Sequence, residues 1–274
     1  FHPRGVKMLE VMIDWSRRAH KARGYIEIIT PQILNEQLWQ RSGHAGYYRE
    51  NMFFTPSLEA EEVVEQEEEQ KRNGATIGVE ERQQKAKLDF AVKPMNCPGC
   101  MIYYGTKKHS YAEFPLRVAE FGKVHRRESS GATHGLLRVQ GFTQDDAHHF
   151  CTPEQLESEV LMCLDFIYRC YEVFGFDDIR LELSTRPEKF VGEIEDWDRS
   201  EATLQQALEK SEKEWKLNPG DGAFYGPKID VHVRDSLKRS WQLGTIQVDY
   251  NLPKRFDLTY VDKDNTEKRP VMLH

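Results

Sequence analysis

Segments in which apolar and polar residues alternate recur through the second half of the chain. Residues 179–183 and 229–233 carry an apolar side chain at every second position, which is typical of a strand that buries one face. Further strand-like segments cover residues 25–30, 115–126, 136–142, 145–150, 241–250 and 256–261. Because these segments follow one another across polar turns, with the helical segments apart from them, the sequence predicts an α+β fold with a largely antiparallel sheet.

Two segments have the period of an amphipathic helix. The first covers residues 3–23 and is followed by Gly24, a residue type that often ends a helix. The second begins at 152–155 with a threonine cap, a proline and a glutamine, and its apolar face continues to Gly175. Pro31 ends the strand-like segment behind the first helix, because proline cannot donate a hydrogen bond to a sheet. The chain is therefore expected to open with a helix, a strand and a proline.

An acidic run interrupts the chain after residue 58. Seven of the twelve residues in 59–70 are glutamate, and 59–89 contributes −5 to the net charge of −7. The run predicts a solvated helix or an insertion at about 57–88, with an acidic segment for a binding partner as the alternative. Without it the chain is close to neutral, so the net charge does not exclude a nucleic-acid partner.

Composition narrows the class of protein further. Hydrophobic residues make up 39% of the chain and charged residues 30%, which allows a buried core and excludes a disordered or collagen-like chain. No stretch approaches the roughly 18 apolar residues of a membrane span, so no membrane association is expected. The five cysteines are too few, and odd in number, for a disulfide framework, which is typical of a reducing compartment such as the cytoplasm.

Basic residues gather in the hairpin that two of these strands are expected to form. Residues 107–140 hold seven lysines and arginines but three acidic residues. Arg126 and Arg138 flank its polar loop, and their forked guanidinium groups suit phosphate oxygens, while Phe142 could stack on a flat base. The chain has no Walker-type or dinucleotide-type glycine loop. Ordinary surface ion pairs stay open as the alternative for these arginines.

Potential metal ligands occur in three places. Cys97 and Cys100 have the C-x-x-C spacing, residues 145–149 add two aspartates and two histidines, and His274 stands last. No second pair of ligands follows at zinc-finger distance, so a closed four-cysteine site is not predicted. Free cysteines and structural histidines stay open as the alternative on spacing alone.

Six ordered blocks together resemble the threonyl-tRNA synthetases, a family of class II aminoacyl-tRNA synthetases. They are 93–99 (KPMNCPG), 117–122 (RVAEFG), 141–148 (GFTQDDAH), 183–189 (LSTRPEK), 222–228 (GAFYGPK) and 269–274 (RPVMLH). The likeness covers nearly the whole chain apart from 57–88. It implies that residues 1–274 are a class II catalytic domain, an antiparallel sheet flanked by helices, that stops before motif 3. It also implies a homodimer through the first helix, the strand and Pro31, which form motif 1.

The resemblance makes the basic hairpin class II motif 2, part of an ATP site. Arg126 would be the catalytic residue, binding the α-phosphate and the amino-acid carboxylate, and Arg138 would bind the pyrophosphate end of ATP. Glu128 would read the adenine amino group and Phe142 would stack on the base. The other implied ATP-binding residues are Val139, Gln242 and Thr245. Residues 127–134 would meet the acceptor end of tRNA.

The resemblance also implies a catalytic-site zinc on Cys97, His148 and His274. Three protein ligands leave a coordination position open, which threonine would fill through its amino group and hydroxyl. A site that must bond a hydroxyl rejects valine, which a hydrophobic pocket separates from threonine poorly. The residues implied to line the threonine pocket are Met95, Gln144, Asp146, Tyr225 and Gln247.

The implied function is that of a threonine–tRNA ligase. It would activate L-threonine with ATP and Mg²⁺ and pass it to the 3′ end of tRNA(Thr), in the cytoplasm or in an organelle. The alternatives are a non-catalytic synthetase-like regulatory or tRNA-binding module, and a class II relative for serine or proline, for which the zinc set is unexpected. The chain departs from the family at Cys100, usually histidine, and at Arg127, usually asparagine.

Overall fold

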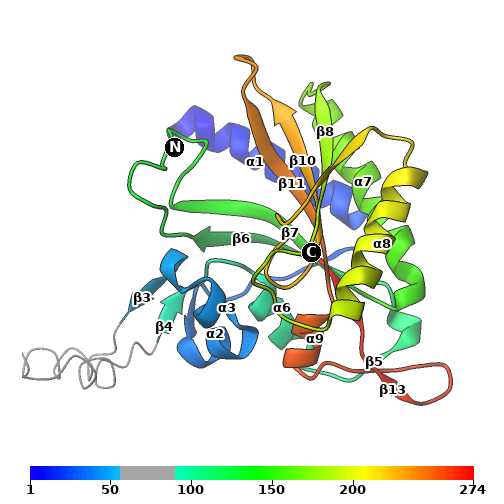
Figure 1. Ribbon diagram of the computed structural model, residues 1–274. Helices are drawn as coiled ribbons and strands as arrows, with labels where there is room; N and C mark the ends of the chain where they lie inside the picture. The colour runs from blue at the N-terminus through cyan, green and yellow to red at the C-terminus, as the bar shows by residue number, and fades with distance from the viewer. Residues whose placement is uncertain (56–89) are drawn as a thin grey trace, which may run out of the picture. The chain divides into compact units, whose positions relative to one another are not determined.

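The computed structural model describes residues 1–55 and 90–274, so the insertion predicted at about 57–88 lies outside the described residues. The chain divides into two compact units, whose elements are labelled in Figure 1. Unit 1 comprises Phe1–Ile28, Cys100–Ala119 and Asp146–His274, and unit 2 comprises Ile29–Gly99 and Glu120–Asp145. No helix within the described ranges combines the length and apolar character that crossing a bilayer requires.

An eight-stranded sheet has most of its strands in unit 1. Its strands are β1 (Ile26–Glu27), β6 (Leu116–His125), β7 (Gly141–Cys151), β8 (Ile179–Ser184), β9 (Trp215–Asn218), β10 (Lys228–Arg234), β11 (Ser240–Asp249) and β14 (Val271–Leu273). Their order is β1-β6-β7-β14-β11-β10-β8-β9, and β6 and β7 continue into unit 2. The β1/β6 and β8/β9 pairs are parallel, whereas antiparallel pairs join β7, β14, β11, β10 and β8 in turn. The predicted α+β fold with a largely antiparallel sheet is confirmed.

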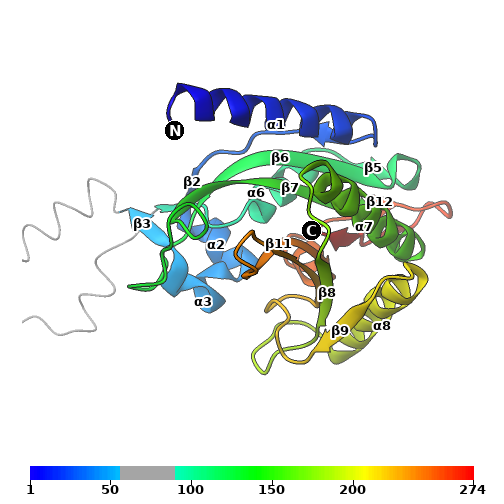
Figure 2. The ribbon, with the colours of Figure 1, turned by 90° about the horizontal axis from the view of Figure 1, so that it is seen from above.

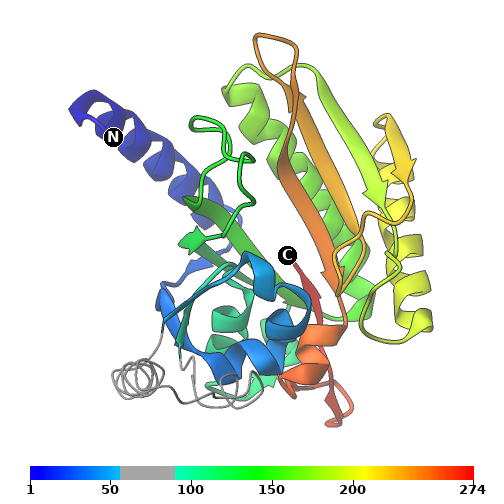
Figure 3. The same ribbon diagram turned by 60° about the vertical axis from the view of Figure 1, so that its left-hand side comes forward.

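Two helices cover one face of this sheet, α7 (Leu156–Val173) and α8 (Ile194–Lys210), and both contact β11. The alternation within the strands explains the arrangement, because the apolar residues of β8 and β10 all point to the helix side. They pack with residues of both helices in one core that contains Leu164, Leu181, Leu204 and Val231. Figure 3 shows α7 running behind β10 and β11. The opposite face of these strands carries polar side chains.

The remaining elements of unit 1 are short, apart from the first helix. They are α1 (Pro3–Lys21), η2 (Tyr111–Glu113), η3 (Pro153–Gln155), α9 (Asn251–Arg255), and the sheet β13 (Glu267–Lys268), β12 (Tyr260–Val261) and β5 (His109–Ser110). Figure 2 shows α1 along its length. The predicted first helix is confirmed, and Gly24 follows it with φ +77°, a conformation that glycine adopts without strain. The strand predicted at 25–30 is limited to β1.

In its described residues, unit 2 is built on a small sheet and three short helical segments. The sheet has the order β2 (Ile33–Asn35), β4 (Phe90–Val92) and β3 (Phe53–Thr55), and the helical turns are α2 (Glu36–Ser42), α3 (His44–Tyr47) and η1 (Arg49–Asn51). Trp39, Met52 and Ala91 form its apolar core. A further helix, α6 (Cys97–Tyr104), begins in unit 2 and continues in unit 1.

Two predicted strands differ in the structure. Residues 136–142 were expected to form a strand, but β7 begins at Gly141 and runs without a break to Cys151. The chain folds back before it, since the backbone N–H groups of Leu137 and Arg138 both donate to the carbonyl of His134. Leu136 and Leu137 are exposed, so the strand was predicted wrongly from apolar residues that lie in a loop.

The second error concerns residues 256–261, of which Tyr260 and Val261 alone form a strand. The preceding α9 ends in a turn in which the N–H of Phe256 donates to Leu252 and that of Leu258 to Pro253. Predictions elsewhere are closer: the capping box at Thr152 is present, and it opens the helical segment as the turn η3 ahead of α7.

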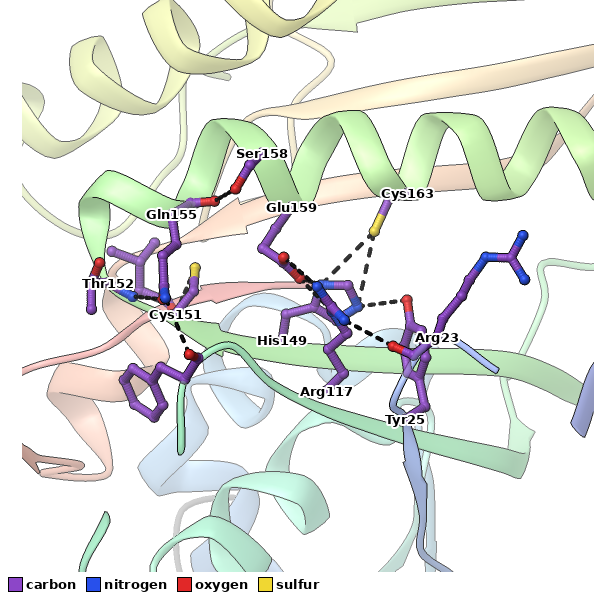
Figure 4. Close-up of polar contacts among 12 residues, drawn as sticks. Arg23, Tyr25, Arg117, His149, Cys151, Thr152, Gln155, Ser158, Glu159 and Cys163 are labelled. Atoms are coloured by element: carbon purple, nitrogen blue, oxygen red, sulfur yellow. Dashed lines mark hydrogen bonds and ion pairs between the residues drawn. The ribbon is translucent and has the colours of Figure 1, made fainter. Parts of the chain in front are cut away.

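A buried polar network joins α7 to the strands of unit 1 (Figure 4). Arg117 on β6 holds the Glu159 carboxylate of α7 through two hydrogen bonds, with Nη2 2.6 Å from Oε1 and Nε 2.7 Å from Oε2. His149 on β7 places Nδ1 2.9 Å from Oε2 of Glu159 and Nε2 2.8 Å from the Tyr25 hydroxyl. Burial alone would raise the pKa of Glu159, but the hydrogen bonds from Arg117 and His149 outweigh it and hold this pKa at about 2.

Replacing Glu159 by glutamine is expected to lower the free energy of unfolding near pH 7 by about 3 kcal/mol. A lowered carboxyl pKa contributes stability that is present above the unfolded-state value of 4.5 and is lost as pH falls toward about 2. Urea denaturation at a series of pH values from 4.5 down toward 2 should therefore show that the free energy of unfolding falls more steeply for the wild type than for Glu159→Gln. Glu157→Gln, which breaks a surface pair with Lys210, is the matched control and should change little. If the free energy of unfolding depends on pH in the same way in all three proteins, the lowered pKa of Glu159 is contradicted.

Candidate functional site

The predicted hairpin site lies in unit 2. The backbone N–H of Arg126 donates to the carbonyl of Gln140 at 2.7 Å, which closes the base of the loop. The Arg126 side chain donates from Nε to the carbonyl of Pro94 at 3.0 Å, and its guanidinium carbon lies 5.3 Å from the centre of the Phe142 ring. These contacts hold the guanidinium group through Nε and through one face.

Arg138 and Glu128 lie close together at the same hairpin. Arg138 donates from Nε to the Glu128 carboxylate at 3.2 Å, which is the surface ion pair that the sequence left open for these residues. Burial raises the pKa of Tyr48, and the charges of Arg126, Glu128 and Arg138 all act on it. The three predicted ATP-binding residues therefore all lie near enough to Tyr48 for their charges to influence its hydroxyl.

The loop itself is tied to η1. The N–H of Arg127 donates to the carbonyl of Asn51 at 2.9 Å, and the Asn51 side-chain amide donates to the carbonyl of Arg127 at 3.3 Å. Sequence reasoning missed this clamp, because the partners are 76 positions apart in the sequence. Val139 and Gln144 are half-buried, and the Met95 sulfur lies 3.1 Å from Nε2 of the buried His44.

Two predicted zinc ligands lie together in unit 1. His148 on β7 and His274, next to β14, have ring centres 5.0 Å apart. Burial and the charge of His274 lower the pKa of His148 to about 4, against the opposing charge of Asp146. A neutral imidazole keeps the lone pair that a metal requires.

Asp249 determines which nitrogen of His274 is available. Its fully buried carboxylate lies 3.0 Å from Nε2 of His274 and accepts the backbone N–H groups of Asn251 and Leu252. A carboxylate there can only accept, so Nε2 of His274 carries the hydrogen and Nδ1 keeps its lone pair. Carboxylate support of this kind is common behind metal-binding histidines. The histidine pair in unit 1 therefore fits a zinc ion.

The third predicted ligand, Cys97, belongs to unit 2, where its buried thiol stands at the start of α6. Cys100, on the same helix, is also buried. All five cysteines are free thiols.

Tyr225 and Gln247, two of the predicted threonine-pocket residues, form a pair in unit 1. The Tyr225 hydroxyl donates to Oε1 of Gln247 at 2.5 Å, and the Tyr225 ring centre is 5.1 Å from that of His274. The backbones of Gln247 and His274 exchange two hydrogen bonds. Gly226 permits this packing, because a Cβ there would lie 1.8 Å from the carbonyl oxygen of Val248.

Gln242 and Thr245 share the polar face of β11 with Gln247. Gln242 and Thr245 are three positions apart, however, whereas residues on one face of a regular strand are an even number of positions apart. Asp230 of β10 pairs with Thr245, but the register shifts at the next pairs, so that His232 pairs with Gln242. This irregularity inserts one extra residue, Leu243, and a bulge of that kind re-aims the side chains beyond it. Gln242 consequently donates to Oγ1 of Thr245 at 2.9 Å.

Some residues that support the site carried no sequence signal. Asp249 and Asp230 are buried aspartates in strands, and only the sheet register identifies what each one faces. Asn51 lies in the short helical turn η1, which Tyr48 directly precedes, and the sequence pattern did not predict this turn.

The chain resembles curated proteins along its whole length. It is 50% identical over 274 residues to the threonine–tRNA ligase of Acetivibrio thermocellus and 48% identical over 275 residues to that of Chlamydia felis. All of this chain is covered in both comparisons, but the chain spans 39% of the length of each relative.

Solved structures give the same result. A structure described as the RNA binding domain of threonyl-tRNA synthetase from Cryptosporidium parvum matches with a TM-score of 0.86 and 40% identity, covering 100% of this chain and 62% of that one. A putative threonyl-tRNA synthetase from Aeropyrum pernix matches with a TM-score of 0.70 and 31% identity, covering 93% and 53%. The family model described as "tRNA synthetase class II core domain (G, H, P, S and T)" matches residues 78–274, well over half of the chain. The chain therefore belongs to the family of class II tRNA synthetase core domains.

Proposed function

We propose that the protein carrying this chain is a threonine–tRNA ligase, which activates L-threonine with ATP and transfers it to the 3′ end of tRNA(Thr). The observation that carries the proposal is the His148–His274 pair supported by Asp249. This donor set suits a zinc ion that selects threonine, and it occurs in a chain 50% identical to a threonine–tRNA ligase.

In the first step the threonine carboxylate attacks the α-phosphate of ATP, and pyrophosphate leaves. An ionised carboxylate needs no general base, so the rate depends on alignment and on stabilising the charge of the pentavalent phosphate. Arg126, held by Pro94 and Phe142, would offset this negative charge with its own positive charge, beside the Mg²⁺ that accompanies ATP. The other ATP-binding residues of the proposal are Glu128, Arg138, Val139, Phe142, Gln242 and Thr245.

Binding of ATP requires a rearrangement at the hairpin. Glu128 is proposed to read the adenine amino group and Arg138 to bind the pyrophosphate end, yet they pair with each other at 3.2 Å. The Arg138 side chain is 60% exposed, so solvent screens its end of the pair, whereas the Glu128 side chain is 13% exposed. The pair therefore has to open when the nucleotide binds.

The zinc of the proposal is held by Cys97, His148 and His274. Bound zinc would supply an electrophilic position for the threonine amino group and hydroxyl. Asp249 orients His274 for this task, and burial keeps His148 neutral. The threonine pocket of the proposal comprises Met95, Gln144, Asp146, Tyr225 and Gln247.

The second step transfers threonine to a terminal ribose hydroxyl of tRNA(Thr). The loop 127–134 is proposed to meet the acceptor end, and its attachment to Asn51 fixes its base. We place the protein in the cytoplasm, the reducing compartment that its free thiols favour.

A second copy of the chain is proposed to pack on α1. Five apolar side chains of this helix are exposed: Val6, Met8, Leu9, Val11 and Met12. Such a face is typical of a subunit interface. Sedimentation equilibrium should give twice the chain mass for the wild type and for Asp14→Asn, a control whose exposed side chain lies on the other side of the helix. Met8→Lys combined with Val11→Lys should give a monomer, and a monomeric wild type at micromolar concentration would contradict the dimer.

The test of the proposed function is ATP–pyrophosphate exchange by the protein at its natural length. Exchange that depends on threonine, exceeds that with valine, and is followed by charging of tRNA(Thr) would support it. The competing function is a non-catalytic synthetase-like regulatory or tRNA-binding module. It predicts tRNA binding without exchange with any amino acid.

A further inference from the structure

Asp230 lies at the centre of the polar face of β8, β10 and β11 and is 1% exposed. Three side chains donate to its carboxylate. Ser184 and Lys228 both donate to Oδ2 at 2.7 Å, and the Gln242 amide donates from Nε2 to Oδ1 at 2.5 Å. Both oxygens of Asp230 therefore accept hydrogen bonds from the protein, and its burial keeps the carboxylate away from a ligand.

The carboxylate determines how the Gln242 amide is oriented. Oδ1 of Asp230 can only accept a hydrogen bond, so the nitrogen of Gln242 must face it. The second hydrogen of that nitrogen is donated to Oγ1 of Thr245 at 2.9 Å. Both amide hydrogens are thus engaged, and Oε1 of the exposed Gln242 is left as the atom that a ligand meets. Gln242 is consequently an acceptor and is suited to a ligand hydroxyl.

The same carboxylate holds Lys228. The Lys228 ammonium lies 2.7 Å from Asp230 and 3.4 Å from Asp221, and its side chain is 12% exposed. A lysine on a flexible stem is otherwise mobile, so the buried partner restricts where its charge lies.

We propose that Asp230 is a positioning residue for the nucleotide, fixing the Gln242 amide so that its oxygen accepts a hydrogen bond from a ribose hydroxyl. The proposal rests on the proposed function, because it takes Gln242 as part of the ATP site. Asp230 touches no ligand and acts through Gln242, with Lys228 and Ser184 holding the carboxylate in place.

Asp230→Asn separates this role from packing. The asparagine oxygen can still accept from Lys228 and Ser184, but its nitrogen then faces Gln242. The Gln242 amide has to turn over, so that it presents a donor instead of an acceptor. In the exchange assay we expect about 30-fold lower kcat/KM for ATP, with KM for threonine unchanged within about twofold.

Nucleotide analogues test the acceptor directly. For the wild type, 2′-deoxy-ATP or 3′-deoxy-ATP should be about 10-fold poorer than ATP, since one of them lacks the hydroxyl that Gln242 accepts. In Asp230→Asn that discrimination should fall toward unity. In Gln242→Ala it should also be lost, and adding Asp230→Asn to Gln242→Ala should lower kcat/KM little further. Asp230→Glu, which keeps the carboxylate, should recover most of the discrimination.

Asp235→Asn is the matched control on the same β10–β11 hairpin. Asp235 accepts the N–H groups of Leu237 and Arg239 and the indole N–H of Trp241. Its replacement should lower the melting temperature and leave the ATP to deoxy-ATP ratio unchanged. An active wild type without discrimination, or an Asp230→Asn ratio equal to that of the wild type, would overturn the proposal. A wild type without threonine-dependent exchange would instead overturn the proposed function.

Discussion

Arg126→Ala is expected to lower the rate of threonine-dependent ATP–pyrophosphate exchange by about 10³-fold, with its main effect on kcat. The guanidinium group is held in place by the Pro94 carbonyl and the Phe142 ring before any ligand binds. If Arg126 binds the α-phosphate as proposed, its charge is preorganised for the negative charge that develops there in the transition state. Such groups act chiefly on the chemical step, because the transition state carries more charge than the substrate.

Arg126→Lys distinguishes charge from geometry. Lysine keeps the positive charge but lacks the forked pair of nitrogens and cannot donate to Pro94 while contacting phosphate, so we expect about a 10²-fold loss. Lys123→Ala, which removes an exposed positive charge near the end of β6, three residues before Arg126, is the control and should stay within about twofold of the wild type. If all three variants exchange pyrophosphate at similar rates, Arg126 is not the catalytic residue.

The sequence predicted those parts of the fold in which side-chain period and burial coincide. Leu181 and Val231 alternate with polar residues because one face of their strands packs against α7 and α8, and both strands are confirmed. Leu136 and Leu137 follow no such rule, since they are exposed in a turn, and the strand predicted there is wrong. The alternation of apolar and polar residues indicates which side chains are buried, so a strand predicted from it is wrong where the apolar residues are exposed.

The site shows a similar division. Motif likeness named Arg126, Glu128 and Arg138, and the structure places all three at the same hairpin, with Arg138 paired to Glu128. It did not name Asp230 or Asp249, each of which has a partner from another strand or segment, Gln242 for Asp230 and His274 for Asp249. A single inserted residue in β11 decides that Gln242 faces Asp230, and no local pattern predicts which strand position carries a bulge.

Cys97→Ala and His274→Ala are expected to lose bound zinc and to lower threonine-dependent exchange by at least about 10³-fold. Their metal content, measured by plasma mass spectrometry, should fall from one zinc per chain to near zero, because two ligands hold zinc poorly. Cys100→Ala is the matched control, a buried thiol three residues along the same helix that is not a proposed ligand. It should retain zinc and activity.

Asp249→Asn tests the support behind His274. An asparagine can offer its nitrogen to Nε2 of His274, which favours the tautomer whose hydrogen sits on Nδ1, the nitrogen needed for zinc. We expect about 10- to 100-fold weaker zinc binding in a chelator competition. A variant with unchanged zinc affinity would contradict the orientation that Asp249 gives to His274.

Selection of threonine over valine is the most specific consequence of the proposed zinc ligands. A hydrophobic pocket separates threonine from valine by about 10²-fold, whereas a site that must bond the hydroxyl rejects the analogue without it by about 10⁴-fold or more. Exchange with valine should therefore be barely measurable in the zinc-loaded wild type, while serine, which keeps the hydroxyl, should be activated. Zinc removal by a chelator should abolish exchange with threonine and serine together. If the zinc-free protein still prefers threonine over valine by the same factor, the hydroxyl is recognised by other residues and the zinc assignment fails.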